Sequence, residues 1–290
     1  MNAFAAFASA ASAIGDVFAH PFMRHAFVAG TAIAAACGLV GYFVVLRSQV
    51  FSTDALSHVA FAGALAALAW GVDPRIGLFG ATIVVAVGIA ALGERGRADD
   101  VVIGTVFTWI LGLGVLFLSI YTTGNSGDNG TANVNVLFGS IFGLDVSQAI
   151  LAAVVGIGLC IGVVCIARPL LFSSVDETVA AARGLPVRAL GIVFLALVGV
   201  CAAEATQAVG ALLLVGLIAA PAGAAHRLTG RPWIGLALSA AIAIASMWIG
   251  LLVSYLHGSI PASFSIMAVA TAAFAVTYVP RPRRNEVASR

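Results

Sequence analysis

Lysine is absent from this chain, and all 14 of its basic residues are arginine. The absence removes the lysine of a Walker A phosphate-binding loop, and with it Schiff-base and lysine general-base chemistry. Charged residues of either sign are also scarce, at 9% of the chain against about 25% in soluble domains. Hydrophobic residues make up 61%, and the mean hydropathy is +1.09. This composition excludes a water-soluble fold and indicates an integral membrane protein surrounded by lipid.

The net charge of +2 is too small to indicate a nucleic-acid partner. The four cysteines all lie in apolar runs, with a spacing that fits neither a zinc knuckle nor a disulfide framework; they are Cys37, Cys160, Cys165 and Cys201. We expect them to be small buried hydrophobic residues. No positively charged region precedes the first apolar stretch, so we expect no cleaved signal peptide.

A membrane-spanning helix needs about 20 mainly apolar residues. The chain offers nine such stretches, and eight to ten are compatible with the pattern. They are residues 27–46, 54–72, 76–93, 101–121, 147–167, 188–204, 206–225, 233–255 and 262–279. The sequence therefore predicts an all-α, polytopic membrane protein, with an N-terminal surface segment at 1–26, a transmembrane domain at 27–280 and a cytoplasmic tail at 281–290.

The arginines orient the chain, because loops on the cytoplasmic side carry an excess of positive charge. If the first span runs inward, twelve arginines face the cytoplasm and only Arg24 and Arg75 face outward. The twelve are Arg47, Arg95, Arg97, Arg168, Arg183, Arg188, Arg227, Arg231, Arg281, Arg283, Arg284 and Arg290. The C-terminus is thus predicted to be cytoplasmic, and the arginine-free loop at 121–146 to face outward.

A short helix is predicted in the cytoplasmic connection at 168–190. Ser174 is a candidate N-cap, Asp176 and Glu177 suit the first turn, and Gly184 is a natural stop. A connector of this kind has the shape of a docking piece for a partner protein.

Asp54 and His58 are the most informative polar residues. Residues four apart share one face of a helix, and an ionised group inside a membrane costs about 2.5–3.5 kcal/mol. Carboxylate oxygen and imidazole nitrogen suit Zn²⁺ or Mn²⁺, whereas no thiolate is at hand for Cu(I). Two ligands leave the coordination sphere open to water or to the same pair from a second copy, with Ser57 in a supporting position. The alternative is structural: Asp54 caps its helix while His58 bonds a neighbouring carbonyl.

Three segments together resemble the zinc/manganese-type permeases of ABC transporters. They are Val45-Leu-Arg47 with Asp54-Ala-Leu-Ser-His58, the predicted short helix at 174–184, and the glycine-to-proline run from Val209 to Ala225. The sequence departs from that family's pattern at Thr53 and Ala262, where glycine is usual, and in its long outer loop, which includes residues 124–135.

The resemblance implies the membrane subunit of a bacterial importer in the cytoplasmic membrane, which performs no covalent chemistry itself. It further implies a permease homodimer, separate ATP-binding subunits and an extracytoplasmic metal-binding protein. Asp54 and His58 would be the metal ligands. Asp176, Glu177, Ala180 and Gly184 would lie in the helix that couples the permease to the ATPase.

Glu204 and His257 are weaker candidates for the ion path; for Glu204 we favour an interfacial end charge, and for His257 a solvated loop histidine. Three other functions stay open. They are a permease for a metal chelate such as haem or a siderophore, a secondary metal carrier, and an intramembrane metalloenzyme, although a His-Glu-x-x-His motif is absent. The residues do not separate zinc from manganese.

Overall fold

The computed structural model describes residues 20–93, 100–124, 139, 141–211 and 214–278. The predicted surface segment up to residue 19, the glycine-rich part of the outer loop and the tail at 281–290 lie outside these ranges. Within them every regular element is helical. The elements are α2 (Pro21–Leu46), α3 (Val50–Ala69), α4 (Pro74–Leu92), α5 (Asp100–Gly124), η2 (Ile141–Gly143), α7 (Val146–Val175), α8 (Glu177–Ala182), α9 (Val187–Val209), α10 (Leu214–Leu228), α11 (Pro232–Leu256) and α12 (Ala262–Val276).

The predicted all-α membrane fold is confirmed. Seven of the described helices are long and apolar enough to cross a membrane, while α10 and α12 have 15 residues each. Together these nine helices correspond to the nine predicted spans. The first begins at Pro21 rather than at 27, because proline at the first helical position has its φ angle already set for a helix.

The break between the sixth and seventh spans lies further along the chain than the apolar pattern predicts. The pattern places it at residue 205, whereas α9 continues to Val209 and is capped by Gly210. Gly210 has φ +91° and ψ 157°, a backbone conformation that is essentially restricted to glycine. Helix α9 therefore ends where only this residue allows the chain to turn.

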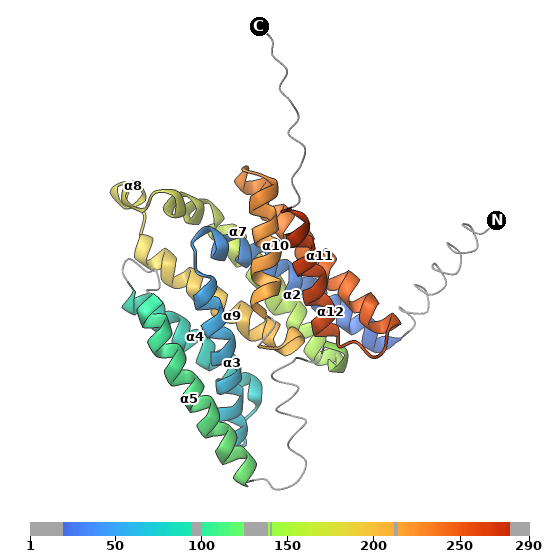
Figure 1. The fold of residues 1–290 in the computed structure, drawn as a ribbon. Helices are drawn as coiled ribbons and strands as arrows, with labels where there is room; N and C mark the ends of the chain where they lie inside the picture. Colours follow the sequence, from blue (N-terminus) through green and yellow to red (C-terminus); the bar gives the residue numbers. More distant parts are fainter. Residues whose placement is uncertain (1–19, 94–99, 125–138, 140, 212–213, 279–290) are drawn as a thin grey trace, which may run out of the picture.

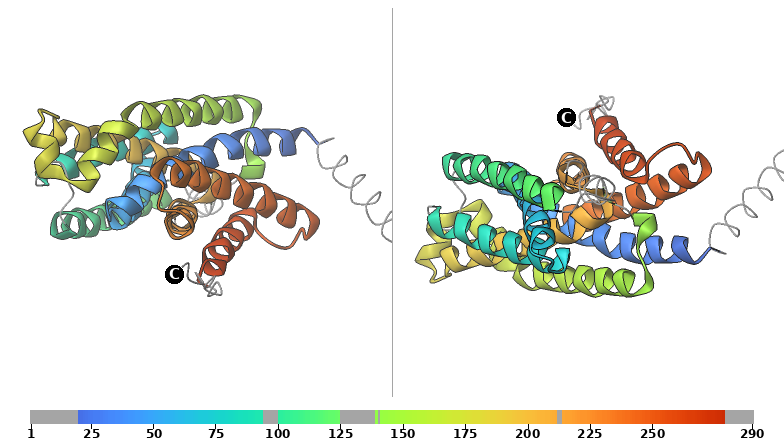
Figure 2. Two further views of the ribbon diagram at one scale, coloured as in Figure 1. Left: turned by 90° about the horizontal axis from the view of Figure 1, so that it is seen from above. Right: turned by 90° about the horizontal axis from the view of Figure 1, so that it is seen from below.

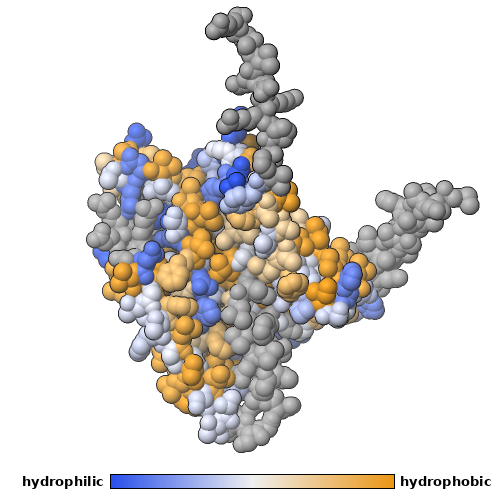
Figure 3. Space-filling model, in the orientation of Figure 1, coloured by the Kyte–Doolittle hydropathy of each residue, from blue (hydrophilic) through white to orange (hydrophobic). Residues whose placement is uncertain are grey.

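Helix α2 lies at the centre of the bundle. It packs against α7 on one side and against α10 and α11 on the other (Figure 2). Helices α4, α5 and α7 bury less than a third of their most apolar windows, whereas α2 buries two thirds. Figure 3 shows that much of the face turned toward the viewer is apolar, including the lower part where α5 lies. The core thus sits around α2, and the peripheral helices present apolar faces suited to lipid.

The predicted short helix exists as α8, but its cap differs from the expected one. Asp176 is the N-cap, accepting hydrogen bonds from Val179 N at 2.9 Å and from the Thr178 hydroxyl at 2.7 Å. Ser174 instead belongs to the last turn of α7, where its hydroxyl donates to Leu170 O. Gly184 has φ +82° just past the end of α8, as a helix stop requires. Figure 1 shows α8 on the same side of the molecule as the C-terminal ends of α10 and α12, all three predicted to be cytoplasmic.

Candidate metal site

The corner between α2 and α3 decides where Asp54 sits. Ser48 N donates to Val45 O at 3.1 Å and Gln49 N to Val44 O at 2.8 Å, which is the Schellman pattern that ends α2. Ser48 occupies the left-handed position with φ 57°. Helix α3 then begins at Val50, so Asp54 lies in its second turn and is not the N-cap. The capping alternative for Asp54 is therefore wrong.

Asp54 and His58 face the same way on α3, as their spacing predicts. His58 Nε2 lies 3.9 Å from Asp54 Oδ1, and the side chains are 18% and 39% exposed, respectively. Two metal–ligand bonds of about 2.1 Å each can span this gap, with a metal ion between the nitrogen and the oxygen. The pair is thus spaced to share one ion, and each side chain remains partly open to an incoming one.

The exposed stripe of α3 runs through this pair. Phe51, Asp54, His58 and Phe61 follow one another at helical spacing and are exposed or half-buried, whereas the residues between them are buried. The rest of α3 packs against α4, α5, α9 and α10. The two candidate ligands therefore lie on the one stripe of the helix that its own neighbours leave accessible.

Helix α5 holds the imidazole from the side. The ring of Phe107 meets the His58 ring edge-on, with 5.2 Å between centroids, and also meets Phe51 at 6.1 Å. Beyond His58, toward the predicted outer end of both helices, lies an apolar cavity of about 360 Å³ between α3 and α5. Its walls include Phe61, Ile110 and Leu118. His58 is thus the polar end of an otherwise apolar space.

Helix α3 is fixed against α4 by a contact between backbones. A Cβ atom on Gly63 would collide with Gly77 O, and one on Gly77 would collide with Gly63 O. Two glycines facing each other allow this close approach, as in other membrane helix pairs. The contact lies within two turns of His58 and holds the ligand-bearing helix at one depth relative to its neighbour.

Within the described residues, no group of three or more histidine, cysteine, aspartate or glutamate side chains could hold a metal ion. Asp54 and His58 are therefore two candidate ligands without a third side chain of these types beside them in the described part of the chain. Ser57 is fully buried, and its hydroxyl donates to Asp54 O, a backbone atom, at 2.7 Å. The described part of a single chain thus offers two candidate ligands, and further ligands are needed to complete the coordination sphere of a metal ion.

The other predicted site residues lie apart from this pair. Glu204 is only 4% exposed, so the favoured interpretation as an interfacial end charge is wrong. Among the described residues its Oε2 atom has no hydrogen-bond partner, and Glu204 has neither an ion pair nor a hydrogen bond with Asp54 or His58. His257 is exposed at the C-cap of α11, as expected of a solvated loop residue.

Helix α8 presents a mixed surface on the predicted cytoplasmic side. Ala180 is fully buried, whereas Val175 and Val179 are 82% and 41% exposed on either side of the Asp176 cap. The hydrogen bond from the Val179 backbone, together with the Thr178 hydroxyl, lowers the pKa of Asp176 below its usual value. The short helix thus begins at a carboxylate whose ionised form is favoured, with two exposed valines beside it.

Two features went unnoticed in the sequence. Asp145 and Gln148 form a capping box at the start of α7, and the Asp-x-x-Gln pattern before an apolar run was a usable signal for it. Cys37 and Cys201 bring their sulfur atoms within 3.7 Å of each other. No local signal predicts that contact, because 164 residues separate the two cysteines.

The bundle of apolar helices, with a partly exposed carboxylate–imidazole pair on α3 and the capped helix α8, has the architecture of a multi-pass membrane permease. The family model described as the ABC 3 transport family matches residues 19–280. The chain belongs to this family, which confirms the family resemblance seen in the sequence.

Named relatives and a solved structure agree with this assignment. The chain is 29% identical over 273 residues to a manganese transport system membrane protein, MntC, of Halalkalibacterium halodurans, covering 93% of this chain and 91% of the relative. It is 30% identical over 275 residues to the manganese transport system membrane protein MntD of Bacillus subtilis, covering 87% and 90%. The fold is similar to PsaBC from Streptococcus pneumoniae in complex with Fab, with a TM-score of 0.81, 24% identity and coverage of 95% and 98%.

Proposed function

We propose that this chain is the membrane-spanning subunit of an ATP-driven importer of divalent transition-metal ions, and that Asp54 and His58 bind the ion during its passage. The observation that carries the proposal is the ligand pair: an oxygen and a nitrogen 3.9 Å apart on the accessible stripe of a buried helix. Carboxylate and imidazole are ligands that both Mn²⁺ and Zn²⁺ accept. The manganese transporters among the relatives favour Mn²⁺ as the principal substrate.

A second copy of the chain completes the coordination sphere in this proposal. A two-fold axis beside the exposed stripe of α3 would bring two Asp54/His58 pairs together and give four protein ligands. Such a site replaces the water that the ion loses, yet remains open enough to release it. His58 binds the ion only as the neutral imidazole, so protonation opposes binding at low pH.

In this proposal, partner proteins supply the energy for transport and deliver the metal ion. ATP hydrolysis takes place on separate subunits beneath the bundle, and α8 is the helix that they contact through Asp176, Glu177 and Gly184. Ala180, which was expected among these contacts, is fully buried and anchors α8 to the rest of the chain instead. An extracytoplasmic metal-binding protein supplies the ion from the opposite side. The exposed valines beside the α8 cap support the first of these contacts.

Uptake of radioactive Mn²⁺ by cells carrying single variants tests the assignment. Asp54→Ala and His58→Ala are expected to lower uptake at least tenfold while the variants still copurify with the ATPase. Asp73→Asn and His257→Gln are matched controls; Asp73 caps α4, and asparagine caps a helix equally well. Wild-type uptake by both α3 variants would remove the site assignment, and measuring Zn²⁺ uptake in parallel ranks the two ions.

The remaining alternatives give different results in the same cells. A permease for a metal chelate would transport its substrate unchanged in the Asp54 and His58 variants. A secondary carrier would transport without a copurifying ATPase and would follow the proton gradient. Uptake that needs ATP and both α3 side chains excludes both.

A further inference from the structure

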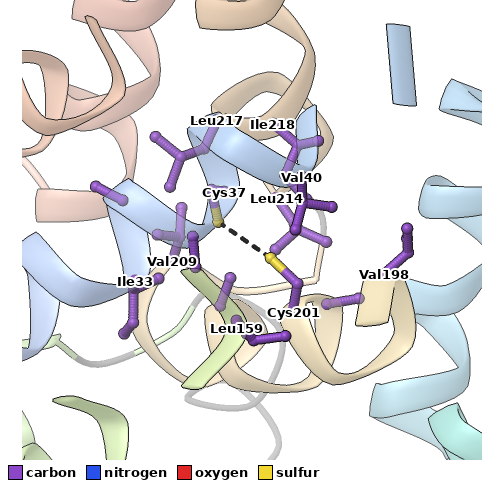
Figure 4. Close-up of a cluster of buried hydrophobic side chains, with 14 of the residues drawn as sticks. Ile33, Cys37, Val40, Leu159, Val198, Cys201, Val209, Leu214, Leu217 and Ile218 are labelled. Atoms are coloured by element: carbon purple, nitrogen blue, oxygen red, sulfur yellow. Dashed lines mark hydrogen bonds between the residues drawn. The ribbon is translucent and has the colours of Figure 1, made fainter. Parts of the chain in front are cut away.

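Helix α10 runs from the apolar core to the side of the molecule that is predicted to be cytoplasmic. Its first turn lies in the core, where Leu214 and Leu217 are drawn among buried apolar side chains (Figure 4). Arg227 lies in its last turn, and Arg231 follows as the N-cap of α11. Both arginines are exposed. The turn that joins α10 to α11 therefore presents two guanidinium groups, which we call the arginine corner.

Arg227 is held in place by the ring of Tyr278, just past the end of α12. Its guanidinium carbon lies 3.6 Å from the ring centroid, which is a cation–π contact. Phe274 meets the Tyr278 ring edge-on at 5.2 Å and packs against Gly223, one turn before Arg227. A cation–π contact uses the flat face of the guanidinium and leaves the N–H groups around its edge able to donate. Two of those N–H groups can bind one phosphate in a fork geometry.

The arginine corner has no acidic residue in its own part of the sequence. Residues 205–285 contain neither aspartate nor glutamate. Helix α2, whose Tyr42 stacks on His226 beside Arg227, contains none either. In the described part of the chain, no ion pair involves Arg227 or Arg231. The ligand that complements the corner is therefore an anion from outside the described residues.

Two aromatic side chains place the corner at the depth of the lipid headgroups. Trp233 in the first turn of α11 is 50% exposed, and Tyr278 is 57% exposed. Tryptophan and tyrosine are enriched where a membrane meets water. Ile234 and Val276, which lie close to them along the chain, are 49% and 68% exposed and offer an apolar surface to acyl chains. The order of apolar, aromatic and cationic groups matches that of acyl chain, glycerol and phosphate in a phospholipid.

We propose that Arg227 and Arg231 bind the phosphate of an anionic phospholipid, of which phosphatidylglycerol is the simplest example. Basic pockets between the cytoplasmic ends of membrane helices are suited to such headgroups. A zwitterionic lipid carries the same phosphate, but its own cation cancels the charge and weakens the attraction. A bound headgroup would join the ends of α10, α11 and α12. This site does not depend on Asp54, His58 or the transported ion.

Titration of short-chain phosphatidylglycerol into the purified full-length chain in detergent, followed by native mass spectrometry, measures the affinity. Phosphatidylcholine of the same chain length is the zwitterionic comparison. We expect phosphatidylglycerol to bind at least tenfold more tightly and to raise the Tm. Arg227→Gln should weaken its binding about fivefold, as expected for one arginine beside an anionic headgroup. Arg227→Lys keeps the charge but loses the paired donors, so we expect a smaller loss of at least twofold.

Arg183→Gln is the matched control. Arg183 is also exposed on the predicted cytoplasmic side and lies over an aromatic ring, that of Phe172, but it follows the acidic residues Asp176 and Glu177 on α8. We expect this variant to change the affinity for phosphatidylglycerol less than twofold. Circular dichroism should show an unchanged fold in every variant. Equal weakening by Arg183→Gln and Arg227→Gln, or equal affinity of the wild type for the two lipids, would overturn the proposal.

Two further measurements distinguish a lipid from other anionic partners. Glycerol 3-phosphate at the same concentration should leave the Tm unchanged, because it lacks acyl chains. Stabilisation by glycerol 3-phosphate equal to that by the lipid would assign the corner to a soluble phosphate compound and overturn the proposal. Loss of a copurifying ATPase from Arg227→Gln, with unchanged lipid affinity, would assign it to a protein partner and also overturn it.

Discussion

Single residues set the geometry of the candidate site through the backbone. Ser48 lies in the left-handed region, and its position in the turn determines that α3 starts at Val50. Asp54 therefore falls in the second turn and His58 in the third, on the accessible stripe. A one-residue change in the start of the helix would rotate both ligands by about 100°. The turn and the ligand pair are thus parts of one arrangement.

Ser48 gives a prediction at this scale. A residue with a Cβ atom is disfavoured by roughly 1–2 kcal/mol in the left-handed conformation, and a β-branched residue is a genuine outlier there. We expect Ser48→Val to lower the Tm of the purified protein and to weaken metal uptake. Ser48→Gly should match or exceed the wild-type Tm. Equal Tm values for the two variants would contradict the role of this turn.

The position of each helix depends on the residues that cap its ends and on its close contacts with neighbouring helices. The box of Asp145 and Gln148 starts α7, Asp176 starts α8, and Gly210 ends α9. Gly63 and Gly77 bring α3 and α4 into backbone contact. In a membrane the hydrophobic effect gives helices no reason to associate, so such close packing carries much of the association.

The contact between α3 and α4 can be tested with two alanine substitutions. Gly63→Ala places a methyl group against the backbone of Gly77 and is expected to destabilise the fold by about 1–3 kcal/mol. Gly80→Ala is the matched control, since no atom lies within 4 Å of the added carbon and alanine favours a helix. Thermal unfolding in detergent should give a lower Tm for Gly63→Ala than for Gly80→Ala. Equal Tm values would show that α3 and α4 do not pack this closely.

Helix α8 has a pH dependence that follows from its cap. The hydrogen bonds from Val179 N and from the Thr178 hydroxyl favour the ionised Asp176 and lower its pKa. Its stabilising effect is therefore complete above the unfolded-state pKa of about 3.9 and is lost as the pH falls through the lower folded value.

We expect hydrogen exchange at residues 178–182, corrected for the intrinsic exchange rate, to be steady between pH 5 and 7 and to rise below about pH 4. Asp176→Asn keeps a cap without a titrating carboxyl, so its corrected exchange should not vary with pH over this range. Asp176→Ala should exchange faster at every pH. Corrected exchange in the wild-type protein that does not change with pH would contradict the role of Asp176 as an ionised cap.

At the scale of the whole molecule, the proposed site needs two chains. The accessible stripe of α3 must then lie beside its copy. Helix α7 should lie away from that copy, because α10 packs against α3 whereas Figure 2 places α7 on the opposite side of α2 from α10. The proposed dimer therefore predicts that the α3 stripes of two copies lie close together and that their α7 helices lie far apart.

Cross-linking in membranes measures this arrangement. In a background with all four native cysteines replaced by serine, Phe61→Cys is expected to give disulfide-linked dimers on mild oxidation. Val154→Cys, which is 62% exposed on α7, is the control and should remain monomeric. Dimers of the Val154→Cys variant, with none of the Phe61→Cys variant, would place the two-fold axis elsewhere. The two Asp54/His58 pairs could then not share a site.

Much of this protein was predictable from local patterns. The nine apolar stretches match the nine long or apolar helices that the structure describes, because a chain in lipid must satisfy its backbone hydrogen bonds within each helix. The pairing of Asp54 with His58 was also predictable, since i and i+4 always share a helix face. The cap of α8 was misassigned by two residues, because α7 runs past its predicted end and takes Ser174 into its last turn.

Composition and periodicity by themselves indicated the all-helical membrane fold, its nine apolar segments and the shared helix face of Asp54 and His58, because each depends only on neighbours along the chain. The tertiary structure alone decided that Glu204 is buried, that Gly63 meets Gly77, and that Cys37 and Cys201 bring their sulfurs together. These facts depend on how the helices pack against one another. In lipid that packing is set by shape complementarity between surfaces distant in sequence, which no local pattern encodes.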